Sequence, residues 1–169
     1  MKSVLILVDE LYEDLELWYP KYRLEEAGHK TVIAGKEAKK NYTGKHGYPC
    51  VSQAAISEIS LKDFHGILIP GGFAPDKLRR NPQVLELVKQ ADKEKKMIAF
   101  ICHAGWVPIS AKILKNRTAT SFFAIRDDME NAGVIWKDEA VVIDKNLITS
   151  RTPADLPLFG KAMVDWLKD

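Results

Sequence analysis

The sequence contains few cysteines, no long apolar run and little net charge. Its two cysteines, Cys50 and Cys102, lie far apart, so they do not form the disulfide framework of a small secreted protein. No apolar stretch approaches the roughly 20 residues that a helix needs to cross a bilayer. The formal net charge of +2 is too small to indicate binding to nucleic acid or to a membrane surface. We therefore expect neither nucleic-acid nor membrane partners.

Export signals and metal-ligand patterns are also absent. The apolar run at residues 4–8 is too short for the core of a signal peptide and is followed at once by Asp9, so it predicts a first strand. With no export signal, a cytoplasmic location with reduced thiols is expected. The histidines, cysteines and acids show no spacing typical of a metal site, so neither a metal nor another cofactor is expected.

Apolar periodicity predicts one α/β domain over residues 1–169. A chain of 169 residues can bury a substantial core, and it has no linker, internal repeat or low-complexity segment. Apolar runs predict strands at 4–8, 30–34, 66–69, 97–101, 117–120, 134–136, 140–143 and 147–149. Helical patterns are predicted at 14–27, 81–95, 107–114, 125–131 and 153–166, and 36–48 is expected to be a loop or small hairpin. The opening strand-helix-strand unit favours a three-layer domain with a mostly parallel central sheet.

Residues 97–106 combine a buried strand, a turn and the start of a helix. The apolar run 97–101 ends at Cys102 and His103, and Ala104-Gly105 permits a tight turn before the next helical segment. This is the pattern of a nucleophile elbow. The free N–H groups and dipole of the new helix favour a thiolate, which predicts a depressed pKa for Cys102. The alternative is that Cys102 is a small buried apolar residue.

Two further strand ends are expected to meet at this elbow. Ligands bind beyond the carboxyl ends of the strands in such a sheet, where residues 9–13 and the turn containing Gly71 and Gly72 also lie. Glycine allows backbone N–H groups to approach a reacting oxygen closely. Cys102 is therefore predicted to be a nucleophile that attacks a carbonyl, with the N–H groups of Gly72 and His103 as the oxyanion hole and Gly71 lining the pocket.

Six segments together resemble the ThiJ/PfpI superfamily, and within it the PfpI-type intracellular cysteine proteases and their general-stress-protein relatives. The matching segments are EDLEL at 13–17, TGKHG at 43–47, LIPGGFAP at 68–75, AFICH at 99–103, DDMENAG at 127–133 and SRTPADL at 150–156. The resemblance implies a flavodoxin-like sandwich that spans the chain and assembles as a dimer or a hexamer.

The same resemblance implies roles for four residues. Cys102 is the reactive cysteine, and Glu13 is a carboxyl partner hydrogen-bonded to its sulfur. Repulsion from a thiolate would keep Glu13 protonated, although a solvated acid at a helix N-terminus is the alternative reading. His103 is the proposed general base and can reach Cys102 only through an unusual turn. Asp76 occupies the position of a glutamate that a neighbouring subunit supplies, and its side chain is one methylene shorter.

The chain departs from the superfamily pattern beside the cysteine. Ala104-Gly105-Trp106 follows His103 where Gly-Pro-Gln is usual, and Pro108 interrupts the expected helix. Phe122 lies in the region where relatives carry a tyrosine. Trp106, which is expected to line the pocket or an interface, and Phe122 make the predicted cleft more apolar and less suited to proton transfer.

Three functions fit this reading. The first is a PfpI-type intracellular cysteine hydrolase that acts on small peptides or other acyl carbonyls. The second is a cofactor-independent glyoxalase or deglycase that acts on methylglyoxal or its adducts, which requires Cys102 and Glu13 but not Asp76. The third is a non-enzymatic sensor of oxidative stress or a chaperone, in which Cys102 is oxidised.

Overall fold

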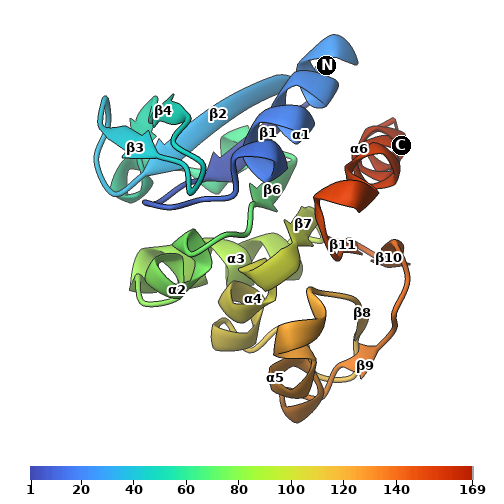
Figure 1. Ribbon diagram of the computed structural model, residues 1–169. Helices are drawn as coiled ribbons and strands as arrows, with labels where there is room; N and C mark the ends of the chain where they lie inside the picture. Colours follow the sequence, from blue (N-terminus) through green and yellow to red (C-terminus); the bar gives the residue numbers. More distant parts are fainter. Residues whose placement is uncertain (169) are drawn as a thin grey trace.

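A seven-stranded sheet forms the middle layer of the molecule in the computed structural model, which describes residues 1–168 (Figure 1). Its strands run in the order β10 (Val141–Asp144), β11 (Leu147–Ser150), β7 (Met97–Ile101), β6 (Gly66–Ile69), β1 (Ser3–Leu7), β2 (Lys30–Gly35) and β5 (Ala54–Ala55). All neighbours are parallel except β10 and β11, which form an antiparallel hairpin at one edge. The order β2-β1-β6-β7-β11 is that of flavodoxin-like folds, so the predicted α/β class with a mostly parallel sheet is confirmed.

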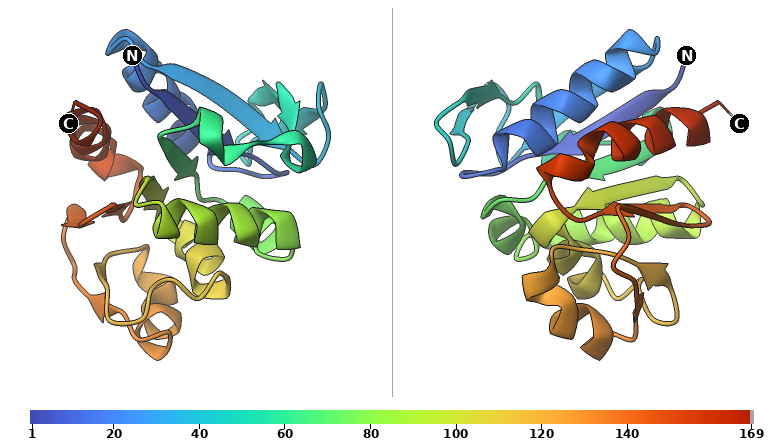
Figure 2. Two further views of the ribbon diagram at one scale, coloured as in Figure 1. Left: turned by 180° about the vertical axis from the view of Figure 1, so that it is seen from behind. Right: turned by 45° about the vertical axis from the view of Figure 1, so that its right-hand side comes forward.

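Helices cover both faces of this sheet. α1 (Asp14–Glu26) connects β1 to β2 and packs beside α6 (Leu156–Trp166), while α3 (Pro82–Lys93) connects β6 to β7 and packs beside α4 (Trp106–Ser110). The chain moves in opposite directions across the sheet in these two crossovers, so right-handed connections place α1 and α3 on opposite faces. Figure 2 shows α1 and α6 side by side.

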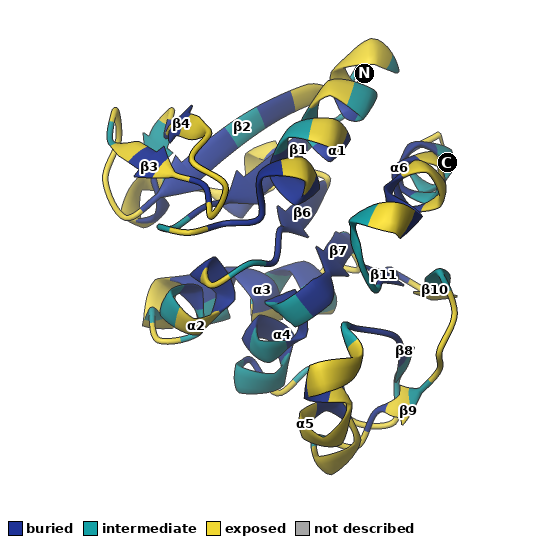
Figure 3. Ribbon diagram, viewed as in Figure 1, coloured by how far each residue is buried: buried dark blue, intermediate teal, exposed yellow. Residues whose placement is uncertain are grey.

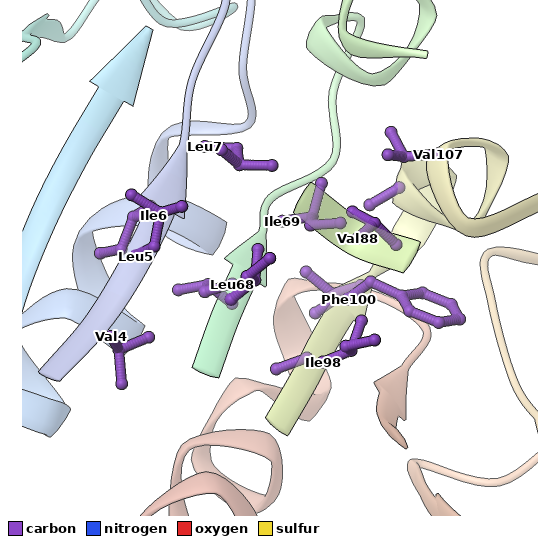
Figure 4. Packing of buried hydrophobic residues seen from close by; sticks show 14 of the residues in the cluster. Val4, Leu5, Ile6, Leu7, Leu68, Ile69, Val88, Ile98, Phe100 and Val107 are labelled. Atoms are coloured by element: carbon purple, nitrogen blue, oxygen red, sulfur yellow. The ribbon is translucent and has the colours of Figure 1, made fainter. Parts of the chain in front are cut away.

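The central strands are buried on both faces, as their uninterrupted apolar runs predict. Every residue of β6 and β7 is buried, and so are Val4 to Leu7 of β1 (Figure 3). Figure 4 shows side chains of β1, β6 and β7 packing with Val88 of α3 and Val107 of α4. This core holds the carboxyl ends of β1, β6 and β7 in fixed positions, and the candidate site lies there.

Several connecting elements are shorter than expected or were not predicted. The expected hairpin is formed by β3 (Asn41–Thr43) and β4 (Pro49–Val51), and a second small sheet pairs β8 (Thr118–Ala119) with β9 (Ile135–Trp136). The unpredicted α2 (Ala74–Leu78) follows β6, and α5 (Arg126–Asn131) follows β8. Short 3₁₀ turns are found at η1 (Ile56–Glu58), η2 (Leu61–Asp63), η3 (Cys102–Gly105), η4 (Phe123–Ile125) and η5 (Pro153–Asp155).

The helix expected at 107–114 was predicted too long. The chain after β7 forms the 3₁₀ turn η3 and then the five-residue helix α4, which ends at Ser110. Lys112 adopts a positive φ of 59°, which right-handed helix cannot accommodate. Within residues 1–168, no helix combines the length and the apolar character needed to span a bilayer.

Candidate active site around Cys102

Cys102 lies at the sharp turn that ends β7. Its φ of +62° is in the left-handed region, which is strained for a residue with a side chain and is concentrated at functional sites. The thiol is almost entirely buried, with 9% of the residue exposed. A Cβ at Gly71 would lie 2.7 Å from Cys102 Cβ, so only glycine fits at the end of β6 beside the thiol. The predicted elbow is therefore present, with Gly71 packed beside the thiol.

Two loops at the neighbouring strand ends are tied together by their backbones. The N–H of Glu13 donates to the carbonyl of Gly71 at 3.0 Å, and the N–H of Phe73 donates to the carbonyl of Leu11 at 2.8 Å. Gly72 has a φ of +80°, and a Cβ there would lie 2.5 Å from the backbone nitrogen of Glu13. Glycine is thus required for this close approach. The paired loops place α1 directly against the elbow.

Glu16 is the carboxyl that α1 presents to Cys102. The residue is fully buried, its Oε2 accepts the N–H of Gly71 at 2.7 Å, and its carboxyl faces the thiol. Oε1 is buried without a hydrogen-bond partner among residues 1–168. Burial raises the pKa of Glu16 from 4.5 to about 8, against the opposing effect of the Gly71 N–H. Glu16 is therefore protonated at neutral pH and can donate a proton beside the sulfur.

Glu13, the partner expected from the resemblance, faces a different group. It caps the N-terminus of α1, where Oε1 accepts the N–H of Leu15 at 3.3 Å. Its Oε2 lies 2.8 Å from Lys45 Nζ and 3.4 Å from His46 Nε2. The assignment of the sulfur contact to Glu13 was therefore wrong. Glu16 follows Glu13 by one helical turn on the same face of α1, and that i, i+3 relation was the signal available in the sequence.

The pKa of Cys102 is raised, contrary to the expected depression. Burial, followed by the charge of Glu16, raises it to about 12, while the N–H groups of His103 and Gly72 and the Lys45 ammonium oppose the rise. The prediction failed because the site is dry and η3 is a single 3₁₀ turn rather than the start of a long helix. At neutral pH both Glu16 and Cys102 therefore hold their protons, and a protonated Glu16 does not repel a thiolate that forms during reaction. The backbone N–H groups of His103 and Gly72 are directed at the sulfur, and their role as an oxyanion hole for a substrate oxygen stays a prediction.

The left-handed turn also brings His103 back to the cysteine. Its Nδ1 lies 3.2 Å from Cys102 Sγ. Burial lowers the pKa of His103, which keeps the ring neutral and able to accept a proton. Phe122 and Trp106 flank this ring with centroid distances of 5.0 and 5.3 Å. Gly71, Trp106 and Phe122 thus lie near the elbow, and their role in lining a pocket stays a prediction.

Asp76 is not brought to His103 within this chain. It lies on the exposed side of α2 and pairs with Arg80 at 3.0 Å. Its role behind His103 across a subunit interface stays a prediction.

A group of possible metal ligands does exist, although the sequence pattern gave no sign of one. Atoms of Glu13, Asp14 and His46 lie within 4.8 Å of one another. The two Asp14 oxygens each accept a backbone N–H at 2.9 Å, from His46 and Tyr48, and the Lys45 ammonium pairs with Glu13. The carboxyl groups of this cluster therefore already have hydrogen-bond and ion-pair partners within the chain.

Comparison with known proteins identifies the family. A model of the DJ-1/PfpI family matches residues 2–166. "Deglycase PfpI" of Pyrococcus furiosus is 42% identical over 166 residues, covering 98% of this chain and 99% of the relative. "Putative cysteine protease YraA" of Bacillus subtilis is 41% identical over 167 residues, with 99% of each chain covered.

A solved structure agrees with this assignment. The two-domain protein of Anabaena variabilis, which contains DJ-1/ThiJ/PfpI-like and ferritin-like domains, superposes with a TM-score of 0.97 and 40% identity over 99% of this chain. The chain spans about half of that protein, 48% of its length. Drosophila melanogaster DJ-1beta shares the fold with a TM-score of 0.93 at 23% identity, covering 98% of this chain and 90% of the other. The chain belongs to the DJ-1/PfpI family.

Proposed function

We propose that the protein is a cofactor-independent enzyme that converts α-oxoaldehydes such as methylglyoxal, or their adducts with amino groups, into 2-hydroxy acids. The observation that carries this proposal is the buried, protonated carboxyl of Glu16 facing the thiol of Cys102. A carboxyl in that position can protonate a carbonyl oxygen as sulfur adds to the carbon, and can then move a proton between carbons. The deglycase name of the Pyrococcus furiosus relative supports the same chemistry.

The first half of the reaction forms a bond between sulfur and carbon. Cys102 adds to the aldehyde carbon while its proton passes to Nδ1 of His103, 3.2 Å away. Glu16 gives its proton to the aldehyde oxygen, which the N–H groups of Gly72 and His103 hold. The products of this step are a hemithioacetal, a Glu16 carboxylate and a protonated His103.

The second half moves one hydrogen and adds water. Glu16 takes the hydrogen from the sulfur-bearing carbon as His103 protonates the neighbouring oxygen, which gives an enediol. Glu16 returns its proton to the neighbouring carbon and takes one from the first oxygen, leaving a thioester. His103 then deprotonates water, the hydroxide displaces sulfur, and the thiolate takes back the proton. Overall, one methylglyoxal and one water give one lactic acid.

Lactate formation from methylglyoxal by the pure protein tests the proposal. Cys102→Ala should abolish it, and Glu16→Gln should reduce kcat by about 10²-fold to 10⁴-fold, the usual contribution of a general acid–base. Cys50→Ala is the matched control, because this second thiol is buried away from the elbow on β4. Lactate formation that survives in Cys102→Ala would refute the mechanism. So would an inactive wild-type protein whose Cys102 still reacts with iodoacetamide.

A cysteine hydrolase is the second candidate, and one contact favours it. The 3.2 Å approach of Cys102 Sγ to His103 Nδ1 is the geometry of a nucleophile and its base. Asp76 faces solvent in the single chain, so this activity would depend on an assembly that supplies an acid to His103. Peptide hydrolysis that is lost in Asp76→Asn, with lactate formation unchanged, would assign the activity to such an assembly.

The structure gives less support to a redox sensor. Peroxide oxidises the thiolate form of cysteine. Burial, followed by the charge of Glu16, raises the pKa of Cys102 to about 12, so little of this thiol is ionised at neutral pH.

A further inference from the structure

Four ring side chains form a continuous aromatic arc beside the thiol. In order along the arc, they are Trp106, His103, Phe122 and Phe123. The centroid of His103 lies 5.3 Å from that of Trp106 and 5.0 Å from that of Phe122, and Phe122 lies 4.8 Å from Phe123. These distances are typical of aromatic contacts. The arc therefore extends outward on both sides of the His103 ring that touches Cys102.

Polar contacts hold the rings of the arc in place. Trp106 Nε1 donates to Asp128 Oδ2 at 2.9 Å. The Arg79 guanidinium lies 5.6 Å from the Trp106 ring centroid and donates from Nε to Ser110 Oγ at 2.9 Å. The backbone N–H of Phe122 donates to the carbonyl of Cys102 itself at 3.1 Å. The arc is thus preorganised and attached to the backbone of the reacting residue.

The arc leaves apolar surface open next to a buried nucleophile. Phe123 is 72% exposed, and Phe122 and Trp106 are half-buried. The single N–H of Trp106 is already bonded to Asp128, and the phenylalanine rings carry no polar atom. The Phe122 and Phe123 rings cannot replace the water lost by a carboxylate or a hydroxyl group, but they pack well against an aryl or branched alkyl group.

We propose that the reacting carbonyl compound carries an aromatic or other bulky apolar group next to its carbonyl, and that this group packs on Trp106 and Phe122. This inference rests on the proposed function and specifies its substrate class. Trp106 and Phe122 are then specificity-determining residues, while Cys102 and Glu16 carry out the chemistry. Arylglyoxals fit the site better than methylglyoxal, whose methyl group is too small to reach along the arc.

Turnover of two matched substrates gives the first test. Phenylglyoxal and methylglyoxal share the reacting aldehyde and differ only in the phenyl and methyl groups, giving mandelate and lactate. The wild-type kcat/KM is expected to be at least tenfold higher for phenylglyoxal. Phe122→Ala and Trp106→Ala should each lower this preference severalfold, mainly through KM for phenylglyoxal. Tyr22→Ala, which removes an exposed ring on α1, is the control and should leave the preference unchanged.

Alkylation of Cys102 gives a second readout that requires no turnover. In a Cys50→Ala background, N-benzyl iodoacetamide should modify Cys102 several times faster than iodoacetamide, as followed by intact mass. The advantage should fall in Phe122→Ala and Trp106→Ala, with thermal melts confirming that both variants are folded. Faster alkylation by the benzyl reagent in a protein that converts neither aldehyde would support the packing of an aryl group on the arc and refute the proposed function. Turnover of the aldehydes without an aryl preference in either assay would refute the packing of an aryl group on the arc and leave the proposed function unaffected.

Discussion

The buried carboxyl of Glu16 makes the stability of the fold depend on pH in a defined direction. The pKa of Glu16 is about 8 in the folded protein, compared with 4.5 for an unperturbed carboxyl. Between these values the folded state holds a proton that the unfolded state has released. The free energy of unfolding therefore falls as pH rises through this window, and its slope is about 1.4 kcal/mol per pH unit. Across the whole window, protonation of Glu16 changes the free energy of unfolding by about 5 kcal/mol, which is a large part of the stability of a domain of this size.

Glu16→Gln isolates this contribution. The amide has the shape of the protonated acid, and its oxygen can still accept the N–H of Gly71. Near pH 8, the free energy of unfolding of the variant should equal or exceed that of the wild type. As pH falls from 8 to 5, the wild type should gain roughly 4 kcal/mol of unfolding free energy while the variant gains none from this position, so the difference should shift in favour of the wild type. Urea unfolding at pH 5, 6, 7 and 8 under reducing conditions measures the difference. Glu86→Gln, which changes an exposed carboxyl on α3, is the control and should follow the wild type.

One outcome would refute this reasoning directly. If the difference in unfolding free energy between the wild type and Glu16→Gln does not change between pH 5 and 8, Glu16 is ionised in the folded protein. Glu16 could not then donate the proton that the proposed addition to an aldehyde requires.

Two further substitutions test the supports of the site. Gly71→Ala places a Cβ against Glu16 Oε2 and 2.7 Å from Cys102 Cβ. The substitution should destabilise the fold by about 1–3 kcal/mol and lower the rate of lactate formation at least tenfold. A variant with unchanged activity would show that glycine is not needed at position 71. Lys45→Met removes the ammonium that pairs with the buried Glu13 carboxyl and leaves that carboxyl the N–H of Leu15 and the neighbouring His46. A loss of about 1–3 kcal/mol in the free energy of unfolding is expected from urea unfolding at pH 8. No loss would mean that solvent compensates Glu13.

Most of the framework follows from local sequence patterns. Uninterrupted apolar runs identify β1, β6 and β7, because a strand buried on both faces leaves no alternation to interpret. Asn81 and Pro82 mark the start of α3, and the Asn81 side chain does accept the N–H of Gln83. The elbow followed from the change at Cys102 from a buried strand to small residues.

The site chemistry was harder to predict because it depends on tertiary distances. Glu13 and Glu16 share one face of α1, and the rotation and height of that helix against β7 decide which of them meets the sulfur. The pKa of Cys102 depends on how dry its surroundings are, which sequence position does not reveal. The arc depends on Asp128, which bonds Trp106 across 22 residues, and no local pattern predicts such a pairing.

The backbone hydrogen bonds between the loops that contain Glu13 and Gly71 also limit how these loops can move when a ligand binds. Because each loop completes the hydrogen bonding of the other, neither can swing away to admit a ligand without breaking bonds in both. In the proposed mechanism, Glu16, Cys102 and the N–H groups of Gly72 and His103 are thus in position before any encounter, and the entropy of arranging them is lost during folding rather than during binding. Under the proposed function, such a site selects its substrate by fit to groups that already lie in place.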